Sequence, residues 1–365
     1  MFVDFYNQRC TFVSLSNSST LKTSYLTSIY KHHREDQLQG RWITLDHIEP
    51  IFIKYDNSPI QYERIGESER KRSIYEFTLG NGPKKILIWT QMHGNESTGT
   101  KAVFDLLNFF CDQDDEVVHD ILANCTIKII PILNPDGAQV YSRLNANKVD
   151  LNRDAVKRVA KESQLLRSRL KGFDPEFCFN LHDQRTIFGV SGTDKSATIS
   201  FLAPSEEVSR KLTNGRKKTM NVIAAMNEAL QEMIPNHVGR YTDEFYPTAT
   251  GDNFQKLGYS TILIESGHYP DDYEREITRE YTFYALLKGI QHIATSNSYA
   301  EYEAYFDIPD NSKNFRDLIH RYEKKKDQAF QFEETLENGE VKFIPIKVKG
   351  DLSGLFFHKE IVFVG

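Results

Sequence analysis

A histidine and a glutamate stand three residues apart just after an apolar run that is typical of a buried strand. The run is residues 86–89, and the pair is His93 and Glu96. Imidazole nitrogens and carboxylate oxygens are ligands that zinc accepts in proteins. The pair is therefore a candidate for half of a metal site, although the same spacing also fits a polar turn in which Glu96 caps the next helix.

Similar groups of polar residues end other apolar runs further along the chain. His182 and Glu265 each follow a strand-like run, and the turn sequence Asn-Pro-Asp-Gly occupies residues 134–137. In open α/β sheets, ligands bind beyond the carboxyl ends of the strands. Side chains placed at these ends are therefore expected to meet at one site. Asp136 and Gly137 are interpreted as turn residues that place the loop after them.

Strand-like runs and helical patterns alternate along the chain. The strand-like runs cover residues 74–79, 85–90, 125–133, 177–181 and 260–264, and the helical patterns cover residues 21–33, 98–111, 208–233 and 281–295. Such alternation is typical of the α/β class, and Ile-rich runs suit strands that are covered on both faces. We therefore predict a mixed, mostly parallel sheet with helices on both faces.

The composition changes near residue 298, where an acidic and aromatic link begins. The sequence predicts a catalytic domain with an N-terminal extension in residues 1–299 and a small β-rich appendage in residues 300–365. Strand-like runs at 341–348 and 361–364 indicate the appendage. Residues 1–20 are rich in Ser and Asn and are interpreted as a tail or an early edge element.

Composition excludes several classes of partner. With 45 basic and 51 acidic residues in 365, the net charge is −6, so nucleic acid is not an expected partner. The chain has neither a secretory signal pattern nor an apolar run of about 18 residues, so we expect no membrane partner and a cytoplasmic location. The four cysteines have no C-x-x-C spacing and are interpreted as free thiols without chemistry.

Four motifs in their chain order resemble the zinc carboxypeptidase family, peptidase family M14 of the carboxypeptidase A clan. They are His93-x-x-Glu96, the turn at 134–137 followed by Arg143 and by Asp-Leu-Asn-Arg at 150–153, His182 at the end of Phe-Asn-Leu-His, and Glu265 in Leu-Ile-Glu-Ser. The resemblance covers roughly residues 70–295. It implies a carboxypeptidase-like fold.

The resemblance also implies roles for single residues. His93, Glu96 and His182 resemble the ligands of one Zn²⁺ per chain, which lowers the pKa of a water molecule and polarises the scissile carbonyl. Glu265 resembles the general base, and Arg143 resembles the arginine that stabilises the oxyanion.

Further matches concern the substrate. Asn152 and Arg153 resemble the pair that binds the terminal carboxylate, for which a guanidinium fork is suited. Asp150 resembles the carboxylate that orients the first zinc histidine. The mobile tyrosine of the family corresponds to Tyr246, with Tyr241 as the second choice.

Two aspartates have open roles. Asp183 either orients a ligand or accepts backbone hydrogen bonds, and Asp252 is expected near the pocket for the substrate side chain, where it would favour a polar or basic residue.

The activity implied by the resemblance is that of a zinc-dependent metallocarboxypeptidase, which hydrolyses the C-terminal bond of peptides with a free terminal carboxylate. Two alternatives use the same scaffold: a zinc N-acyl-amino-acid deacylase similar to succinylglutamate desuccinylase and aspartoacylase, and an inactive peptide-binding member. The Asn-Pro-Asp-Gly and Asp-Leu-Asn-Arg motifs favour the carboxypeptidase. A pure binding module has no need of Glu265 and Arg143.

Overall fold

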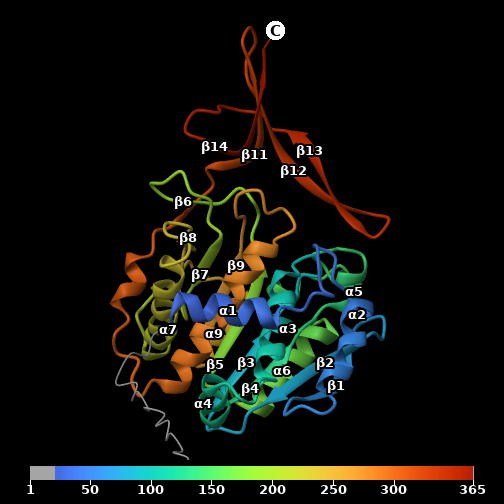
Figure 1. Ribbon diagram of the computed structural model, residues 1–365, viewed down its shortest axis with the longest axis vertical. Coiled ribbons are helices and arrows are strands. Elements are labelled where there is room, and N and C mark those ends of the chain that lie inside the picture. Colours follow the sequence, from blue (N-terminus) through green and yellow to red (C-terminus); the bar gives the residue numbers. More distant parts are fainter. Residues whose placement is uncertain (1–20, 365) are drawn as a thin grey trace, which may run out of the picture.

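The computed structural model describes residues 21–364, so the interpretation of residues 1–20 and of Cys10 lies outside the described part. An eight-stranded sheet forms its centre (Figure 1). The strands are β1 (Gln61–Glu67), β2 (Ser73–Leu79), β3 (Lys84–Trp89), β4 (Cys125–Ile130), β5 (Phe177–Asp183), β7 (Ile199–Leu202), β8 (Val238–Arg240) and β9 (Ser260–Ser266). Their order is β1-β2-β4-β3-β5-β9-β7-β8, and the central strands β4, β3, β5 and β9 are parallel.

Helices cover both faces of this sheet. One face carries α1 (Thr23–His33), α3 (Thr98–Phe110), α4 (Glu116–Asn124), α7 (Asn214–Gln231) and α9 (Glu276–Thr295), and the other carries α6 (Lys161–Phe173) and α8 (Thr250–Lys256). Each face of the sheet carries a hydrophobic core, because successive side chains of a strand point to opposite faces. Along β3, Ile86 and Ile88 belong to the core under α3 and α9, while Leu87 and Trp89 belong to the core under α6 and α8. The predicted mixed, mostly parallel sheet with helices on both faces is confirmed.

Short elements complete the main body, namely α2 (Leu45–Ile48), η1 (Glu49–Tyr55), α5 (Pro135–Gln139), η2 (Leu151–Arg153) and η3 (Glu303–Asp307). No helix within residues 21–364 is long and apolar enough to cross a lipid bilayer. Cys125 and Cys178 are buried free thiols, and Cys111 is a half-buried one.

The C-terminal segment forms a sheet of its own. Its strands are β11 (Phe315–Tyr322), β12 (Gln328–Glu337), β13 (Glu340–Lys347) and β14 (Phe356–Phe363), in the order β13-β12-β11-β14. Figure 1 shows this sheet beyond one end of the main sheet. The link before it pairs β10 (Asn311–Ser312) with β6 (Gly189–Val190) of the main body. The predicted β-rich appendage is confirmed, while the boundary between residues 299 and 300 stays a prediction.

A row of rings joins the appendage to the main body. His268, just after β9, lies with its ring centroid 4.7 Å from that of Tyr273 and 4.0 Å from that of His358 on β14. Both ring nitrogens of His268 are buried without a hydrogen-bond partner in the described chain. Burial, together with the charge of His358, holds the pKa of His268 well below its usual 6.5.

We therefore expect acid to weaken this fold. A histidine that stays neutral in the folded state but is protonated in the unfolded state contributes stability above pH 6.5, and that contribution is lost as the pH falls below 6.5. The free energy of unfolding should fall by at most about 1.4 kcal/mol per pH unit from this group. Denaturant unfolding of wild type and His268→Phe between pH 8 and pH 5 tests this. The variant should show the shallower pH dependence, and equal slopes would contradict it.

Candidate active site

Three side chains converge at the carboxyl ends of β3 and β5. His93 Nδ1 lies 2.8 Å from Glu96 Oε1, His182 Nδ1 lies 2.8 Å from Glu96 Oε2, and the two Nδ1 atoms are 3.2 Å apart. The three are buried, and their ligand atoms all lie within 4.8 Å of one another. Within residues 21–364, they form the one group of three or more His, Cys, Asp or Glu side chains that could hold a metal ion.

The turn after β3 is positioned by close backbone packing. A Cβ on Gly94 would lie 2.0 Å from the carbonyl carbon of Gly137, so only glycine lets the loops after β3 and β4 cross there. The side chain of Asn134 accepts a hydrogen bond from the Gly137 N–H at 2.9 Å, and Asp136 pairs with Arg72 at 2.7 Å. These contacts agree with the interpretation of Asp136 and Gly137 as turn residues.

A second layer of polar groups holds His93. Asp150 Oδ1 lies 3.0 Å from His93 Nε2, while Asp150 Oδ2 accepts from Arg143 Nη2 at 3.0 Å. A hydrogen bond from Nε2 to Asp150 leaves the lone pair of Nδ1 directed toward Glu96. Arg143 Nη1 also lies 3.2 Å from Glu96 Oε1 and 3.2 Å from His93 Nδ1. The guanidinium is therefore placed against the triad.

Glu265 reaches the same place from β9. It pairs in register with His182 on the neighbouring strand, so both side chains leave the sheet at its carboxyl edge. The half-buried Glu265 carboxylate accepts no hydrogen bond from the described residues. Burial, and next the charge of Glu96, raises the pKa of Glu265 well above its usual value. This carboxyl group thus has a high affinity for a proton and no structural partner among the described residues.

Asn152 and Arg153 lie on η2, close to His182. Asn152 Nδ2 is 3.5 Å from His182 Nε2, and its Oδ1 accepts from the Thr250 N–H at 2.9 Å. The Arg153 guanidinium is exposed, and its Nη1 donates to the Asn152 carbonyl at 2.7 Å. The Asn152 amide therefore lies beside the triad, and the exposed Arg153 guanidinium lies against the Asn152 backbone.

Both candidate tyrosines lie in the loop before α8. Tyr246 is 47% exposed, its hydroxyl donates to Glu244 at 2.9 Å, and its N–H donates to Asp252 at 2.9 Å. Tyr241 is half-buried, and burial with the charge of Glu265 raises the pKa of its hydroxyl. The Tyr246 side chain is therefore exposed and bonded only to Glu244, whereas Tyr241 stands near the carboxyl group of Glu265.

The two aspartates with open roles are both held by backbone groups. Asp252 is buried and accepts from the Tyr246 N–H, and burial raises its pKa to about 6. Asp183 accepts from the N–H and the hydroxyl of Thr98 at the start of α3. For Asp183, the hydrogen-bond acceptor interpretation is the one that the contacts favour.

A sequence model of the zinc carboxypeptidase family, Peptidase_M14, matches residues 54–331, which is more than half of the chain. The chain belongs to the zinc carboxypeptidase family. Its curated relatives include carboxypeptidase SOL1 of Arabidopsis thaliana, 43% identical over 65 residues, which are 17% of this chain and 13% of that protein. Carboxypeptidase D of Homo sapiens is 29% identical over 108 residues, 25% of this chain and 8% of that protein. The matches thus span a small part of the relatives' own length.

Several solved structures share the fold. The metallo-carboxypeptidase from Burkholderia cenocepacia aligns with a TM-score of 0.55 at 18% identity, over 68% of each chain. Thrombin activatable fibrinolysis inhibitor aligns with a TM-score of 0.56 at 12% identity, over 78% of each chain. At these identities the likeness establishes the architecture and leaves the substrate open.

In this member of the zinc carboxypeptidase family, His93, Glu96 and His182 are the zinc-binding triad. The residues fit the ion, because two imidazole nitrogens and a carboxylate converge on one point and three protein ligands are the usual set of a catalytic zinc. Although burial opposes charge on His93, the carboxylates of Glu96 and Asp150 raise the pKa of its ring to about 9. Burial lowers the pKa of His182. At neutral pH the ring of His93 is therefore doubly protonated in the metal-free triad, and it carries one proton more than a zinc ligand can.

Zinc binding should release that proton. Because His93 ligates only when Nδ1 is unprotonated, we expect about one proton to leave per zinc bound at pH 7, and fewer above pH 9. Calorimetric titration in two buffers of different ionisation enthalpy measures the number. Asp150→Asn removes one of the carboxylates that favour the charged ring, so it should reduce the release. Zinc binding with no proton release at pH 7 would contradict the assignment.

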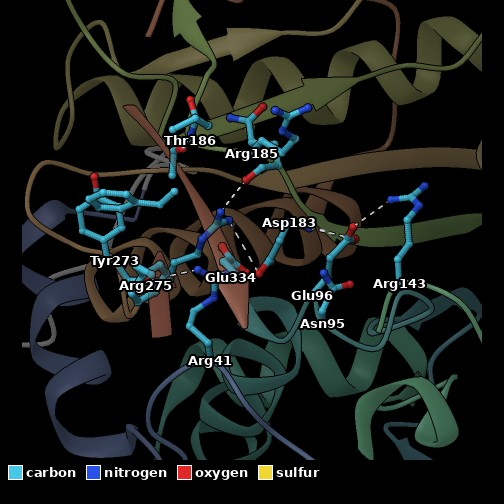
Figure 2. Close-up of a pocket in the computed structure, with 14 residues that line it drawn as sticks. Arg41, Asn95, Glu96, Arg143, Asp183, Arg185, Thr186, Tyr273, Arg275 and Glu334 are labelled. Carbon is cyan, nitrogen blue, oxygen red and sulfur yellow. Dashed lines mark hydrogen bonds and ion pairs between the residues drawn. The ribbon is translucent and has the colours of Figure 1, made fainter. Parts of the chain in front are cut away.

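The pocket beside the triad also contains residues that no motif indicated. Arg41, Tyr273, Arg275 and Glu334 line it together with Glu96 (Figure 2). They come from three separate segments, namely the chain before α2, the loop between β9 and α9, and strand β12. None of the four belongs to one of the sequence motifs described above. These residues could therefore not be predicted from the sequence.

Proposed function

We propose that this protein is a zinc-dependent carboxypeptidase that removes the C-terminal residue from peptides with a free terminal carboxylate. The observation that carries the proposal is the position of the Glu265 carboxyl group beside the triad of His93, Glu96 and His182, with Arg143 against the same atoms. A general base, an oxyanion donor and a metal triad at one point are the parts that peptide hydrolysis needs.

Each side chain takes one task in this proposal. When bound, zinc supplies Lewis acidity that polarises the scissile carbonyl and lowers the pKa of a water molecule. Glu265 accepts the proton from the attacking water and passes it to the leaving amine. Arg143 donates to the carbonyl oxygen as its negative charge develops. Asp150 keeps His93 in the tautomer whose Nδ1 faces the triad.

The exposed flank of the site supports the exopeptidase specificity. Arg153 and Asn152 present a guanidinium fork and an amide beside the triad, a pairing suited to a planar carboxylate. Tyr246 lies exposed in the adjacent loop and is the residue that we propose to close over the substrate.

Replacing Arg153 with Ala tests this flank. The charge-assisted contact to the terminal carboxylate is lost, so KM for free-acid peptides should rise about tenfold or more while cleavage chemistry is retained. Steady-state kinetics on a matched pair of peptides, one with a free and one with an amidated C-terminus, measures the effect. Wild type should prefer the free acid, and the variant should lose most of that preference. An unchanged KM would remove Arg153 from the carboxylate site.

Mass-spectrometric digestion of a mixed library tests the function as a whole. The library contains free-acid peptides, the same peptides amidated, and N-acyl amino acids. Release of single C-terminal residues from the free acids alone supports the carboxypeptidase. Cleavage confined to N-acyl amino acids would replace it with a deacylase on the same scaffold. No turnover by zinc-loaded protein would indicate an inactive binding member.

A further inference from the structure

The triad opens on one side into a cavity of about 320 Å³. Glu96 and Arg143 line this cavity, whereas Asn152, Arg153 and Tyr246 do not. In the proposed function, the terminal carboxylate of the peptide lies with Arg153. The residues on the N-terminal side of the scissile bond must leave the triad in another direction, and this cavity is the hollow available to them.

The C-terminal sheet builds one wall of the cavity. Gln331, Phe332, Glu334 and Phe343, from β12 and β13, line it, and the rings of Phe332 and Phe343 each lie 5.2 Å from the ring of Tyr273. Figure 1 shows the β12–β13 hairpin extending over the end of the main body. The appendage therefore takes part in the site rather than standing apart from it.

Contacts at several points fix this wall to the main body. Gln331 Nε2 donates to the Thr186 hydroxyl at 2.7 Å, and Glu334 pairs with Arg41 at 3.1 Å. At the hairpin turn, Gly339 lies against the Trp42 ring. The wall is thus held to the main body at three separate points.

The lining of the cavity is rich in arginine. Arg41, Arg143, Arg185 and Arg275 stand against three carboxylates, Glu96, Asp183 and Glu334 (Figure 2). Glu334 pairs with Arg41, and Glu96 lies within the triad. Asp183 Oδ2 accepts from Thr98 and lies 3.7 Å from Arg275, while Asp183 Oδ1 is buried without a hydrogen-bond partner in residues 21–364. Four guanidinium groups thus face three carboxylates. The cation that the triad binds adds further positive charge. The cavity is therefore electropositive.

Two of the arginines offer donors to a ligand. Arg185 is exposed and makes no hydrogen bond or ion pair with residues 21–364. Arg41 is 4% exposed, and its Nε–H is buried without a partner in the same part of the chain. Figure 2 shows Arg41 and Arg185 on opposite sides of the cavity. A buried donor without a partner and a free guanidinium together suit an anionic group.

We propose that this cavity binds the substrate residues that precede the scissile bond and selects an acidic side chain there, with Arg185 as its main partner. The proposal rests on the proposed function and names a substrate class for it: peptides with Asp or Glu within the last residues before the bond. The aromatic wall of Tyr273, Phe332 and Phe343 packs against the aliphatic part of that segment.

Kinetics on matched peptides test the proposal. Acetylated peptides carry Glu or the isosteric Gln at the first or the second position before the scissile bond, with the same C-terminal residue. Wild type should show kcat/KM about fivefold higher for Glu at one of these positions, the size of a partly exposed ion pair. The Glu/Gln ratio should fall to near one in Arg185→Gln and be partly restored in Arg185→Lys. Arg64→Gln, an exposed arginine on β1, is the matched control and should keep the ratio.

The outcomes separate this proposal from the function on which it rests. If wild type cleaves the Glu and Gln peptides equally, or if Arg185→Gln keeps the preference, the acidic subsite is wrong and the carboxypeptidase stands. If zinc-loaded protein cleaves no peptide, the proposed function fails, and calorimetric binding of the same peptides decides the subsite. Tighter binding of the Glu peptides that is lost in Arg185→Gln supports it, and equal affinities overturn it.

Discussion

Glu265→Gln should lower kcat by about 10²–10⁴-fold, the usual contribution of a general base. The amide has the size of the carboxyl group but cannot accept the proton of the attacking water. The Glu265 carboxylate has no hydrogen-bond partner among the described residues, so the substitution leaves no structural group unpaired. We expect the fold, the zinc content and peptide binding to be preserved, so the loss should fall on kcat.

Single-turnover kinetics, metal analysis and thermal unfolding of the variant check these expectations together. Glu63→Gln, an exposed glutamate on β1, is the matched control and should keep wild-type turnover. Turnover near the wild-type rate in Glu265→Gln, with zinc bound, would show that another group takes the proton.

Arg143→Gln should lower kcat by about 10²–10³-fold and change KM much less, because an oxyanion donor acts mainly in the transition state. Arg143 Nη1 lies 3.2 Å from both Glu96 Oε1 and His93 Nδ1, so its guanidinium faces the point where the carbonyl oxygen gains charge. Arg143→Lys keeps the charge and loses the fork, and it should recover part of the rate.

The split between kcat and KM, measured with a free-acid peptide, distinguishes this role from substrate binding. A variant with raised KM and unchanged kcat would place Arg143 in ground-state binding. Because Arg143 also pairs with Asp150 at 3.0 Å, zinc content must be measured beside the rates. Arg64→Gln again serves as the control for loss of an arginine.

The triad and the central strands were predictable because their signals are local. Strands β3, β5 and β9 are covered on both faces, so each appears as a continuous apolar run that ends in the residues of the site. Parallel pairing then brings those ends to one edge, as for His182 and Glu265. Residues that follow separate strands in the sequence therefore lie together at one edge of the sheet.

Several helices gave weaker signals. Helix α6 is highly charged and buries only a narrow stripe that includes Leu166 and Leu170. Its apolar pattern is therefore too weak to predict a helix from the sequence. Helix α4 begins in an acidic stretch for which the sequence predicted no helix, and its N-cap Asp115 accepts from the N–H of Val117 and Val118. Helix α7 starts at Asn214 and not at residue 208 as predicted, because Thr213 is its N-cap.

The walls of the cavity could not be predicted from local sequence patterns. Arg41 Nη2 and Glu334 Oε1 lie 3.1 Å apart although they come from opposite ends of the chain. The sequence predicted the β-rich appendage that carries Glu334 but gave it no contact with the site. Only the docking of the C-terminal sheet onto the end of the main body creates this contact. Pairings of this kind depend on the whole fold.

The most direct test of the account is zinc-dependent turnover of one matched pair of peptides. Protein stripped of metal is titrated with zinc while release of the C-terminal residue is followed from a free-acid peptide and from its amide. The account predicts that activity on the free acid rises with zinc and reaches its plateau at about one ion per chain, with little cleavage of the amide. Cleavage without zinc, or equal cleavage of acid and amide, would contradict a zinc-dependent carboxypeptidase.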